Sequence, residues 1–270
     1  MQGSSREAFA TGHGAFAAAL ASGADASSLG EDLFAVTAAL DSSASLRRAL
    51  VDPSRSATAK RDLVDALFGP KLSAEATDVL KVLVSQRWAD AMDLADAIES
   101  FAVEAVVASA EANGRLDDLE DELFRFGRVV AADPGLRTAL AAHGGDELAK
   151  ATLVQALLEG KASAETIRLA RQAALYPRGR RFDQVLETYL AIAARRREQL
   201  TALVTVAVAL DDAQRQRLES ALSGIYHKPV QINVVLDPVV VGGIRVQVGD
   251  EVVDGTILRR IQEAERALLR

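Results

Sequence analysis

The glycines close to the end of the chain are the first residues whose spacing suggests a binding chemistry. Gly242, Gly243 and Gly249 could let backbone N–H groups approach an anion such as a phosphate. However, no Gly-x-Gly-x-x-Gly links a strand to a helix, and no Gly-Lys is followed by Ser or Thr. We therefore expect a β-bulge and a hairpin turn at these glycines, and no nucleotide or other cofactor.

The residues that usually perform catalysis or bind metals do not gather in this sequence. His13, His143 and His227 have no carboxylates at ligand spacing, so no metal site is predicted. The chain has no cysteine, which excludes disulfides, zinc thiolate sites and thiol nucleophiles. It also has no Gly-x-Ser-x-Gly motif. Because no nucleophile, base and orienting group can be named together, we expect a protein without catalytic residues.

Charged clusters leave two interpretations open. Arg178, Arg180, Arg181 and the run Arg195–Arg197 either lie on a solvated loop and helix face or contact a phosphate or an acidic partner. The acidic run over residues 117–122 fits the start of a helix, where the helix dipole favours negative charge. The net charge is −7, and none of the three stretches 1–110, 111–199 and 200–270 is net basic. A nucleic-acid partner is therefore not expected.

An internal repeat organises the first two hundred residues. The segment Leu46–Leu50 recurs 90 positions later as Leu136–Leu140, and Ser73–Glu75 recurs as Ser163–Glu165. Each serine is typical of a helix N-cap followed by an acidic residue in the first turn. A period this long is typical of two tandem copies of a small domain rather than of a solenoid.

Apolar residues at spacings of three and four predict helices within each copy. One predicted apolar face contains Leu63 and Leu67 and, in the second copy, Leu153 and Leu157. Trp88 and Phe182 occupy equivalent positions, and we expect both in the core. Between Phe101 and Ala112 no helix breaker occurs, so a continuous helix is expected to join the copies.

The spacing of apolar residues changes in the last seventy residues and predicts an α/β module. Apolar alternation over residues 201–210 predicts a strand, and Asp211 to Gln214 form a capping-box pattern that starts a helix ending near Gly224. A second strand follows over Val230–Leu236, and then a hairpin with its turn at Gly249-Asp250. Apolar spacing over residues 257–268 predicts a final helix.

The predicted fold is therefore mainly α, with two tandem helical bundles followed by a βαββ(β)α module. The expected domains are residues 1–110, 111–199 and 200–270, and the first helix of the second bundle could begin near residue 101. The longest strongly apolar run, residues 200–210, is far shorter than the ~20 residues of a membrane helix. We expect any membrane association to come through a partner.

The end of the chain also carries a family resemblance. Gly242-Gly243 and the run Gly249 to Thr256 resemble the closing signature of the δ subunit of F-type ATP synthases, the counterpart of the mitochondrial oligomycin-sensitivity-conferring protein. The resemblance covers residues from about 101 to 270. The extra copy in residues 1–110 is similar to the long δ chains of actinobacteria. The residues expected to be structural or to lie at an interface are Gly242, Gly243, Gly249, Asp250, Asp254 and Gly255. For Asp254, a helix cap before Thr256 is the favoured interpretation.

The resemblance implies a function. A δ subunit connects the peripheral stalk to the catalytic head, binding the N-terminal segments of α subunits and the b subunit, with one copy per complex at the cytoplasmic face of the cell membrane. The extra copy would then stiffen the stalk or take over a b contact. The alternative is a cytoplasmic regulator with helical interaction modules and a ligand-sensing α/β domain.

Overall fold

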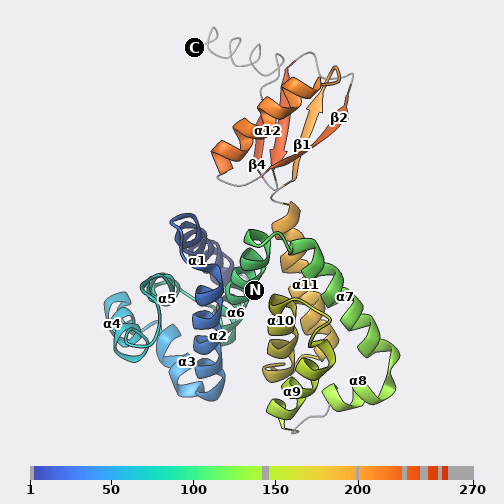
Figure 1. The fold of residues 1–270 in the computed structure, drawn as a ribbon. Helices are drawn as coiled ribbons and strands as arrows, with labels where there is room; N and C mark the ends of the chain where they lie inside the picture. Colours follow the sequence, from blue (N-terminus) through green and yellow to red (C-terminus); the bar gives the residue numbers. More distant parts are fainter. Residues whose placement is uncertain are drawn as a thin grey trace. The chain divides into compact units, whose positions relative to one another are not determined.

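The chain divides into a helical unit, Met1–Ala193, and a second unit, Ala194–Arg270 (Figure 1). The computed structural model describes residues 3–141, 146–198, 201–226, 230–237, 243–248 and 251–254. Twelve helices and a small four-stranded mixed sheet in these ranges confirm the predicted fold class. Both predicted bundles lie in the helical unit.

Eleven described helices begin in the helical unit. Five precede the central helix α6 (Ala91–Ala112): α1 (Ser4–Ala21), α2 (Ala26–Ser42), α3 (Ala44–Val51), α4 (Ala57–Leu67) and α5 (Ala74–Ser85). Five follow it: α7 (Leu116–Ala132), α8 (Pro134–Ala141), α9 (Glu147–Leu158), α10 (Ala164–Leu175) and α11 (Phe182–Glu198). We call α1–α6 the first copy and α6–α11 the second copy, so that α6 belongs to both. The continuous helix expected between the copies is confirmed, because α6 closes the first and opens the second.

Short polar caps set the helix starts. In seven helices the side chain of the N-cap residue accepts a hydrogen bond from a backbone N–H two or three residues later. These caps are Asp25, Ser43, Ser56, Ser73, Asp90, Asp146 and Ser163. Such a bond satisfies one of the donors that a helix start leaves unpaired. The predicted caps Ser73 and Ser163 are thereby confirmed.

One tertiary contact appears in both copies at the same place. In the first copy, Asp32 of α2 accepts hydrogen bonds from the backbone N–H and the hydroxyl of Ser73, at 2.8 and 2.7 Å. In the second, Glu122 of α7 accepts the same pair from Ser163, at 2.9 Å each. We call this contact the carboxylate–serine clamp. It fixes the second helix of each copy to the fifth and shows that the sequence repeat is a structural repeat.

The cores are built largely from small aliphatic residues, as the aromatic content of 4% requires. In the first copy, Phe9 and Phe16 of α1 surround Phe101 of α6, with ring centroids 5.0 and 5.3 Å from it. Trp88 and Phe182 are buried, which confirms the core positions predicted for them.

The apolar face predicted for α4 is wrong at Leu67, and its counterpart in α9 is only half-buried. Leu67 is 42% exposed, and the buried residues of α4 are Lys60 and Val64. In α9 the corresponding Lys150 and Val154 are likewise buried, whereas Leu153 and Leu157 are half-buried. The helix is rotated from the expected face because a lysine can bury its aliphatic stem while its ammonium group stays near water.

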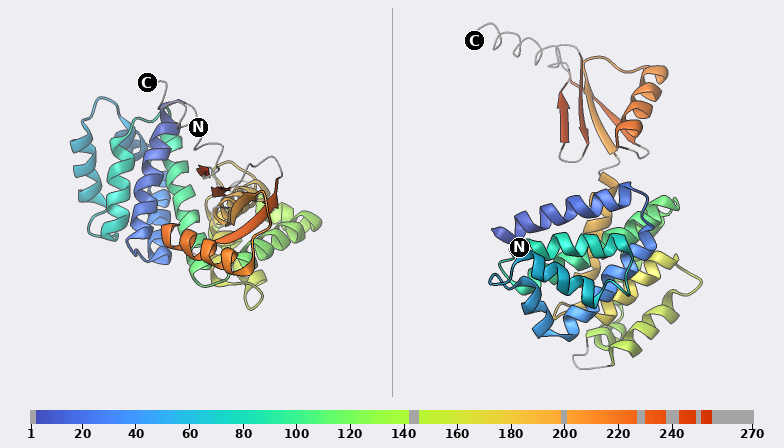
Figure 2. Two further views of the ribbon diagram at one scale, coloured as in Figure 1. Left: turned by 90° about the horizontal axis from the view of Figure 1, so that it is seen from above. Right: turned by 90° about the vertical axis from the view of Figure 1, so that its left-hand side faces the viewer.

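The second unit contains a sheet in the order β2-β1-β3-β4, with β1 (Thr201–Val206), β2 (Gln231–Leu236), β3 (Ile244–Val248) and β4 (Glu251–Asp254). β1 pairs in parallel with β2 and antiparallel with β3, and β3 pairs antiparallel with β4. The helix α12 (Asp212–Tyr226) lies against one face (Figure 2), where Leu222 is buried with residues of β1, β2 and β3. The predicted order of strands and helix is confirmed as far as β4.

Two local predictions in this unit are wrong. The first strand, β1, ends at Val206 instead of residue 210, because neither β2 nor β3 pairs with any residue of β1 beyond Val206. Helix α12 continues through Gly224 to Tyr226, whose ring packs against the core of the sheet. The capping box is confirmed, since Asp211 and Gln214 exchange hydrogen bonds of 3.0 and 2.7 Å. The predicted final helix lies outside the described residues.

Candidate interaction site

The residues singled out from the family resemblance lie around the β3–β4 hairpin. Gly243 precedes β3 with φ of +86°, a backbone conformation that favours glycine. Val248 pairs with Glu251, so the two strands are joined by two residues, as predicted. Asp254 is the last residue of β4, opposite Arg245. The other four residues lie outside the described residues: Gly242, Gly249, Asp250 and Gly255. The helix that Asp254 was predicted to cap also lies outside them.

No group of three or more His, Asp or Glu side chains that could hold a metal ion occurs in the described ranges. His13, expected to stand apart from carboxylates, in fact lies beside Glu104 of α6, with Nε2 3.1 Å from the nearer carboxylate oxygen. His143 and His227 fall outside the described residues. The His13–Glu104 contact joins α1 to α6 beside Phe101, so it belongs to the packing of the first copy.

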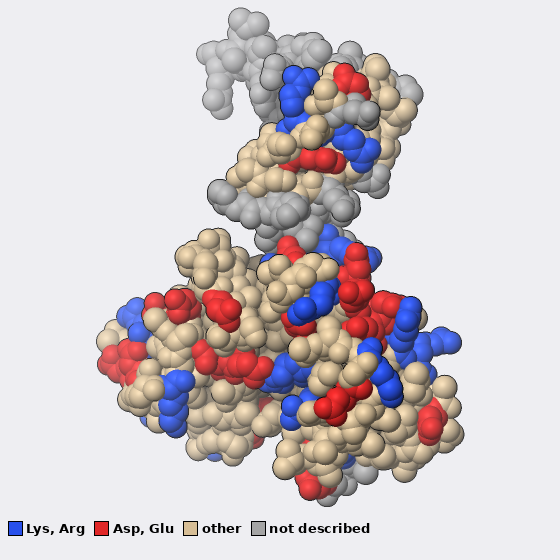
Figure 3. Space-filling model, in the orientation of Figure 1, with Lys and Arg blue, Asp and Glu red and all other residues tan. Residues whose placement is uncertain are grey.

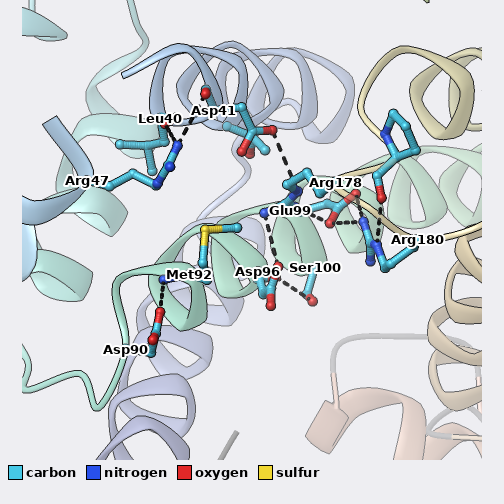
Figure 4. A network of polar contacts seen from close by, with 12 residues as sticks. Leu40, Asp41, Arg47, Asp90, Met92, Asp96, Glu99, Ser100, Arg178 and Arg180 are labelled. Atoms are coloured by element: carbon cyan, nitrogen blue, oxygen red, sulfur yellow. Dashed lines mark hydrogen bonds and ion pairs between the residues drawn. The ribbon is translucent and has the colours of Figure 1, made fainter. Parts of the chain in front are cut away.

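A cluster of buried ion pairs joins the two copies, and we call it the inter-copy network (Figure 4). Glu99 of α6 accepts hydrogen bonds from Arg180 at 2.9 and 2.8 Å and also pairs with Arg178. Arg178 in turn donates to Asp96 of α6 at 3.0 Å and lies 3.6 Å from a carboxylate oxygen of Asp41 in α2. The loop before α11 is thereby tied to two helices that lie far earlier in the chain.

Burial shapes the protonation of the groups in this network. The hydroxyl of Tyr189 donates to Glu99 at 2.7 Å, and burial together with the Glu99 carboxylate raises its pKa well above the usual value. Burial likewise raises the pKa of Asp41, although Arg178 opposes the shift. Because the side chain of Glu99 is only 4% exposed, removing its charge would leave two arginines without their main acceptor.

The network corrects the interpretation of the arginine cluster. Arg178 is not on a solvated face, and both it and Arg180, whose side chain is 30% exposed, are paired with acidic residues inside the chain. Arg178 adopts φ of +47°, which is uncommon outside glycine, so its ion pairs hold a strained backbone. Arg181 is exposed and pairs with Asp183 at 2.5 Å. Arg195 and Arg197 of α11 are exposed as well and also match the solvated interpretation, whereas Arg196 is buried.

Sequence reasoning did not single out Glu99, Asp96 or Asp41. A usable signal was present for Glu99, which interrupts a run of buried apolar residues in α6 that includes Ile98 and Phe101. A carboxylate on an otherwise buried helix face needs a buried cationic partner. Its partners could not be named from sequence because Arg178 follows it by 79 positions.

A second contact between the copies places α2 against both α6 and α10. A Cβ atom at Gly30 would lie 3.1 Å from Val106 and 3.3 Å from the carbonyl oxygen of Ala102, so α2 and α6 pack backbone to backbone. The guanidinium of Arg168 in α10 pairs with Glu31 and lies 4.3 Å from the ring centroid of Phe34. The second helix of the first copy therefore covers a face of the second copy.

Several large apolar side chains are exposed in the second copy and on the sheet. In the second copy Phe124, Val129 and Leu148 are each more than half exposed. In the sheet, the face opposite the buried core carries Leu203, Val235 and Val252, which the strand register places on one side. Figure 3 shows acidic and basic side chains interspersed over the visible face of the helical unit, without a field of one sign. Such surfaces are suited to protein partners.

Comparison with known proteins decides the family. The family model described as "ATP synthase delta (OSCP) subunit" matches residues 13–104 and again residues 98–268. The chain is 51% identical over 248 residues to the ATP synthase subunit delta of Kineococcus radiotolerans, covering 92% of this chain and 90% of that protein. It is 44% identical over 269 residues to the protein of the same name from Streptomyces coelicolor, covering 99% and 98%. This chain belongs to the ATP synthase delta (OSCP) family.

The family match agrees with the structural repeat. Its two segments divide near residue 100, within the helix α6 that both copies share. The predicted resemblance to the long actinobacterial δ chains is confirmed, because relatives of that name from actinobacteria match over most of their own length. As a member of this family, the chain is a non-catalytic subunit of the F-type ATP synthase. None of its described helices is long and apolar enough to cross a membrane.

Proposed function

We propose that this δ-family chain is the peripheral-stalk connector of the proton-translocating ATP synthase. It joins the α subunits of the catalytic head to the b subunit, so that the head does not turn with the rotor and torque drives ATP synthesis. Each complex contains one such chain, at the cytoplasmic face of the cell membrane. The chain reaches the membrane only through its partners.

One observation carries this proposal: the two helical copies form a single unit rather than two units on a flexible linker. The shared helix α6, the inter-copy network and the docking of α2 all act between the copies. A connector under torque needs such an undivided body, because a hinge between the copies would absorb motion that must be resisted. A sensor domain has no such requirement.

The surface chemistry also supports a connector. Phe124, Val129 and Leu148 offer apolar contact area. Apolar helix faces bind partner helices in grooves, and such interfaces achieve long residence through slow dissociation.

The test is calorimetric titration of the full chain with two probes. The first is a synthetic peptide of the N-terminal segment of the partner α subunit, and the second is the soluble helical part of the b subunit. Saturable one-to-one binding of both is expected. Absence of binding to either one would contradict the connector role, whereas a rise in melting temperature with a small metabolite would favour the regulator instead.

We further propose that the first copy stiffens the stalk rather than replacing a b contact. Its helix α2 supports the second copy through Gly30, Glu31 and Phe34. Deleting residues 1–100 would uncover α6 and α10, so point variants in the full chain are the cleaner test. Leu67→Ser on the first copy should leave the affinity for the b helix unchanged. A loss of b binding in that variant would show that the first copy makes the b contact.

A further inference from the structure

The docking of α2 on the second copy has an unused counterpart in α7. Helices α2 and α7 are each 17 residues long and correspond residue by residue at an offset of 90, as their clamp carboxylates Asp32 and Glu122 show. In the first copy this helix makes an internal contact, whereas in the second copy it lies along the outer edge of the helical unit (Figure 1). The residues that α2 uses for docking therefore indicate what the open face of α7 can bind.

Two side chains of α2 together hold one arginine. The guanidinium of Arg168 in α10 lies 4.3 Å from the ring centroid of Phe34 and donates to Glu31 at 3.0 Å. A second nitrogen of the same guanidinium donates to Gln172, one turn further along α10, at 3.0 Å. Glu31 and Phe34 are three positions apart, which makes their side chains neighbours on the helix surface. An acid and an aromatic ring at this spacing form a receptor for an arginine, because the carboxylate pairs with the guanidinium and the ring face attracts its charge.

Helix α7 carries the same two residue types at the same two positions. Asp121 stands where α2 has Glu31, and Phe124 stands where α2 has Phe34. Phe124 is 57% exposed, and 51% of the Asp121 side chain is exposed. The receptor that Arg168 fills on α2 is therefore open to solvent on α7.

An arginine of the same helix occupies the acid of this receptor in the free chain. Arg125, four positions after Asp121, pairs with it at 2.8 Å and has 76% of its side chain exposed. An exposed pair along one helix contributes little to stability, because water and salt screen it. Arg125 can therefore release Asp121 to the arginine of a partner at small cost.

The residue before Asp121 determines how closely a partner can approach. At Gly30 of α2 the lack of a side chain brings the helix against α6, where a Cβ atom would lie 3.3 Å from the carbonyl oxygen of Ala102. The equivalent residue of α7 is Glu120, which is half-buried. Its side chain keeps a partner helix further from α7 than α6 is from α2. A long basic side chain such as arginine is suited to reach across that distance.

We propose that Asp121 and Phe124 form a docking site for a helix of the b subunit that presents an arginine, with its guanidinium over the ring and paired with the carboxylate. The occupant rests on the proposed function, in which the chain binds b and the first copy makes no b contact. The contact of Arg168 with Glu31 and Phe34 sets the geometry. The charge on Asp121 adds specificity for a basic helix to the apolar contact area of Phe124.

Another molecule of this chain is unsuited to the site. Its Arg168 is already covered by its own α2, through Glu31. The equivalent position of its first copy is Asp78, with 75% of the side chain exposed, which would meet Asp121 as a like charge. The charges therefore favour a different, basic partner over self-association.

Calorimetric titration of the full chain with the soluble helical part of b tests the ring and the acid separately. Phe124→Leu keeps an apolar side chain without the ring and should weaken binding about fivefold, whereas Phe124→Tyr keeps the ring and should bind like the natural chain. Asp121→Lys should weaken binding about tenfold at low salt and less at high salt, because the reversed charge repels the arginine and salt screens it. The matched controls Leu67→Ser and Asp62→Lys, both at exposed positions of α4, should change nothing.

Removing the competing arginine should change binding in the opposite direction. Arg125→Ala frees Asp121 for the partner and should tighten binding of the b helix about two- to threefold at low salt. Arg61→Ala removes an exposed arginine of α4 and is the matched control, which should leave binding unchanged. Weaker binding in Arg125→Ala would overturn the competition between Arg125 and the partner.

The arginine of the partner is identified by a double-mutant cycle. Each arginine of the b helix is replaced by alanine in turn and titrated against the natural chain and against Phe124→Leu. One of these replacements should weaken binding to the natural chain about fivefold but have little further effect on Phe124→Leu, because both changes remove the same contact. If every replacement has its full effect in both chains, no arginine lies over the ring and the proposed contact is wrong.

The outcomes separate the docking site from the proposed function. If the natural chain binds the b helix and both Phe124→Leu and Asp121→Lys bind it equally well, the connector role stands and the site is wrong. If the natural chain itself does not bind, the b contact of the proposed function fails and the site falls with it. Sedimentation of the natural chain alone should show a monomer. A dimer that Asp121→Lys dissociates would mean that another molecule of the chain occupies the site, which would overturn its assignment to b.

Discussion

The second helices of the two copies, α2 and α7, have the same length and the same role in the repeat but opposite surroundings. Phe34 of α2 is 2% exposed, whereas its counterpart Phe124 of α7 is 57% exposed. Both helices nevertheless make the carboxylate–serine clamp, through Asp32 and Glu122. The scaffold of a duplicated domain is thus maintained by a few local polar contacts, while the outward faces are free to become an internal interface in one copy and open surface in the other.

The largest expected effect comes from breaking the inter-copy network. Glu99→Ala should lower the free energy of unfolding by about 3–5 kcal/mol, because Arg178 and Arg180 lose a buried counter-charge. Urea denaturation of the full chain, followed by circular dichroism, measures it. The control is Asp121→Ala, which removes an exposed pair with Arg125 and should cost under about 1 kcal/mol. Equal costs would mean that the network does not hold the copies together.

The next effect tests the comparison between α2 and α7 directly. Phe34→Ala should cost about 3 kcal/mol, because it leaves a cavity between α2 and the second copy and removes the ring beneath Arg168. Phe124→Ala at the equivalent position should stay within about 0.5 kcal/mol, as exposed substitutions usually do. The same denaturation experiment measures both. A similar cost for the two variants would contradict their different surroundings.

The clamp should show the opposite result, with equal effects in the two copies. Ser73→Ala and Ser163→Ala each remove an N-cap and a hydrogen bond to a carboxylate, so each should cost about 1–2 kcal/mol. Because the sites are far apart in sequence and lie in different copies, the double variant should show the sum of both costs. Thermal unfolding of the three variants measures this. A large cost in only one copy would show that the clamp is not a shared element of the scaffold.

The smallest expected effect concerns acid stability in the second copy. Burial acts to raise the pKa of Glu165, but hydrogen bonds from its own backbone N–H, Arg115 and Asn113 outweigh burial and hold the pKa below its usual value. A lowered folded pKa gives stability that is present above the unfolded pKa, about 4.3 for glutamate, and is lost as the pH falls through the folded value.

Glu165→Gln should therefore reduce stability at neutral pH and flatten its decline below about pH 4.3, the usual range of a glutamate. The exposed Glu75 occupies the equivalent position of the first copy, so Glu75→Gln is the control and should leave the pH profile unchanged. Melting temperatures between pH 3 and 7 measure both variants. An unchanged profile in Glu165→Gln would contradict the stabilising role of its ionised form.

Short-range features of this chain could be predicted from sequence. The caps at Ser73 and Ser163, the capping box at Asp211 and Gln214, and the two-residue hairpin each depend on residues within four positions of one another. The internal repeat could also be recognised from the sequence, because the duplicated residues keep the same spacing in both copies. The strand order also followed from apolar alternation and turn residues.

Long-range features could not be predicted in the same way. The burial of Arg178 depends on Glu99 in α6 and Asp41 in α2, which lie far earlier in the chain. The exposure of Leu67 depends on the rotation of α4, which its own spacing does not determine because Lys60 fits the buried face equally well. The docking of α2 on α10 depends on the contact between Glu31 and Arg168, which lie 137 positions apart.

The span of the contact between Glu31 and Arg168 has a consequence for how the protein is made. During synthesis α2 leaves the ribosome well before α10, and at a typical rate of about 5–20 residues per second that wait lasts several seconds or more. Until α10 arrives, the apolar side chains of α2 and the face of α6 have no complete partner. During synthesis the N-terminal half of the chain therefore has to wait for α10 before Arg168 can cover Phe34.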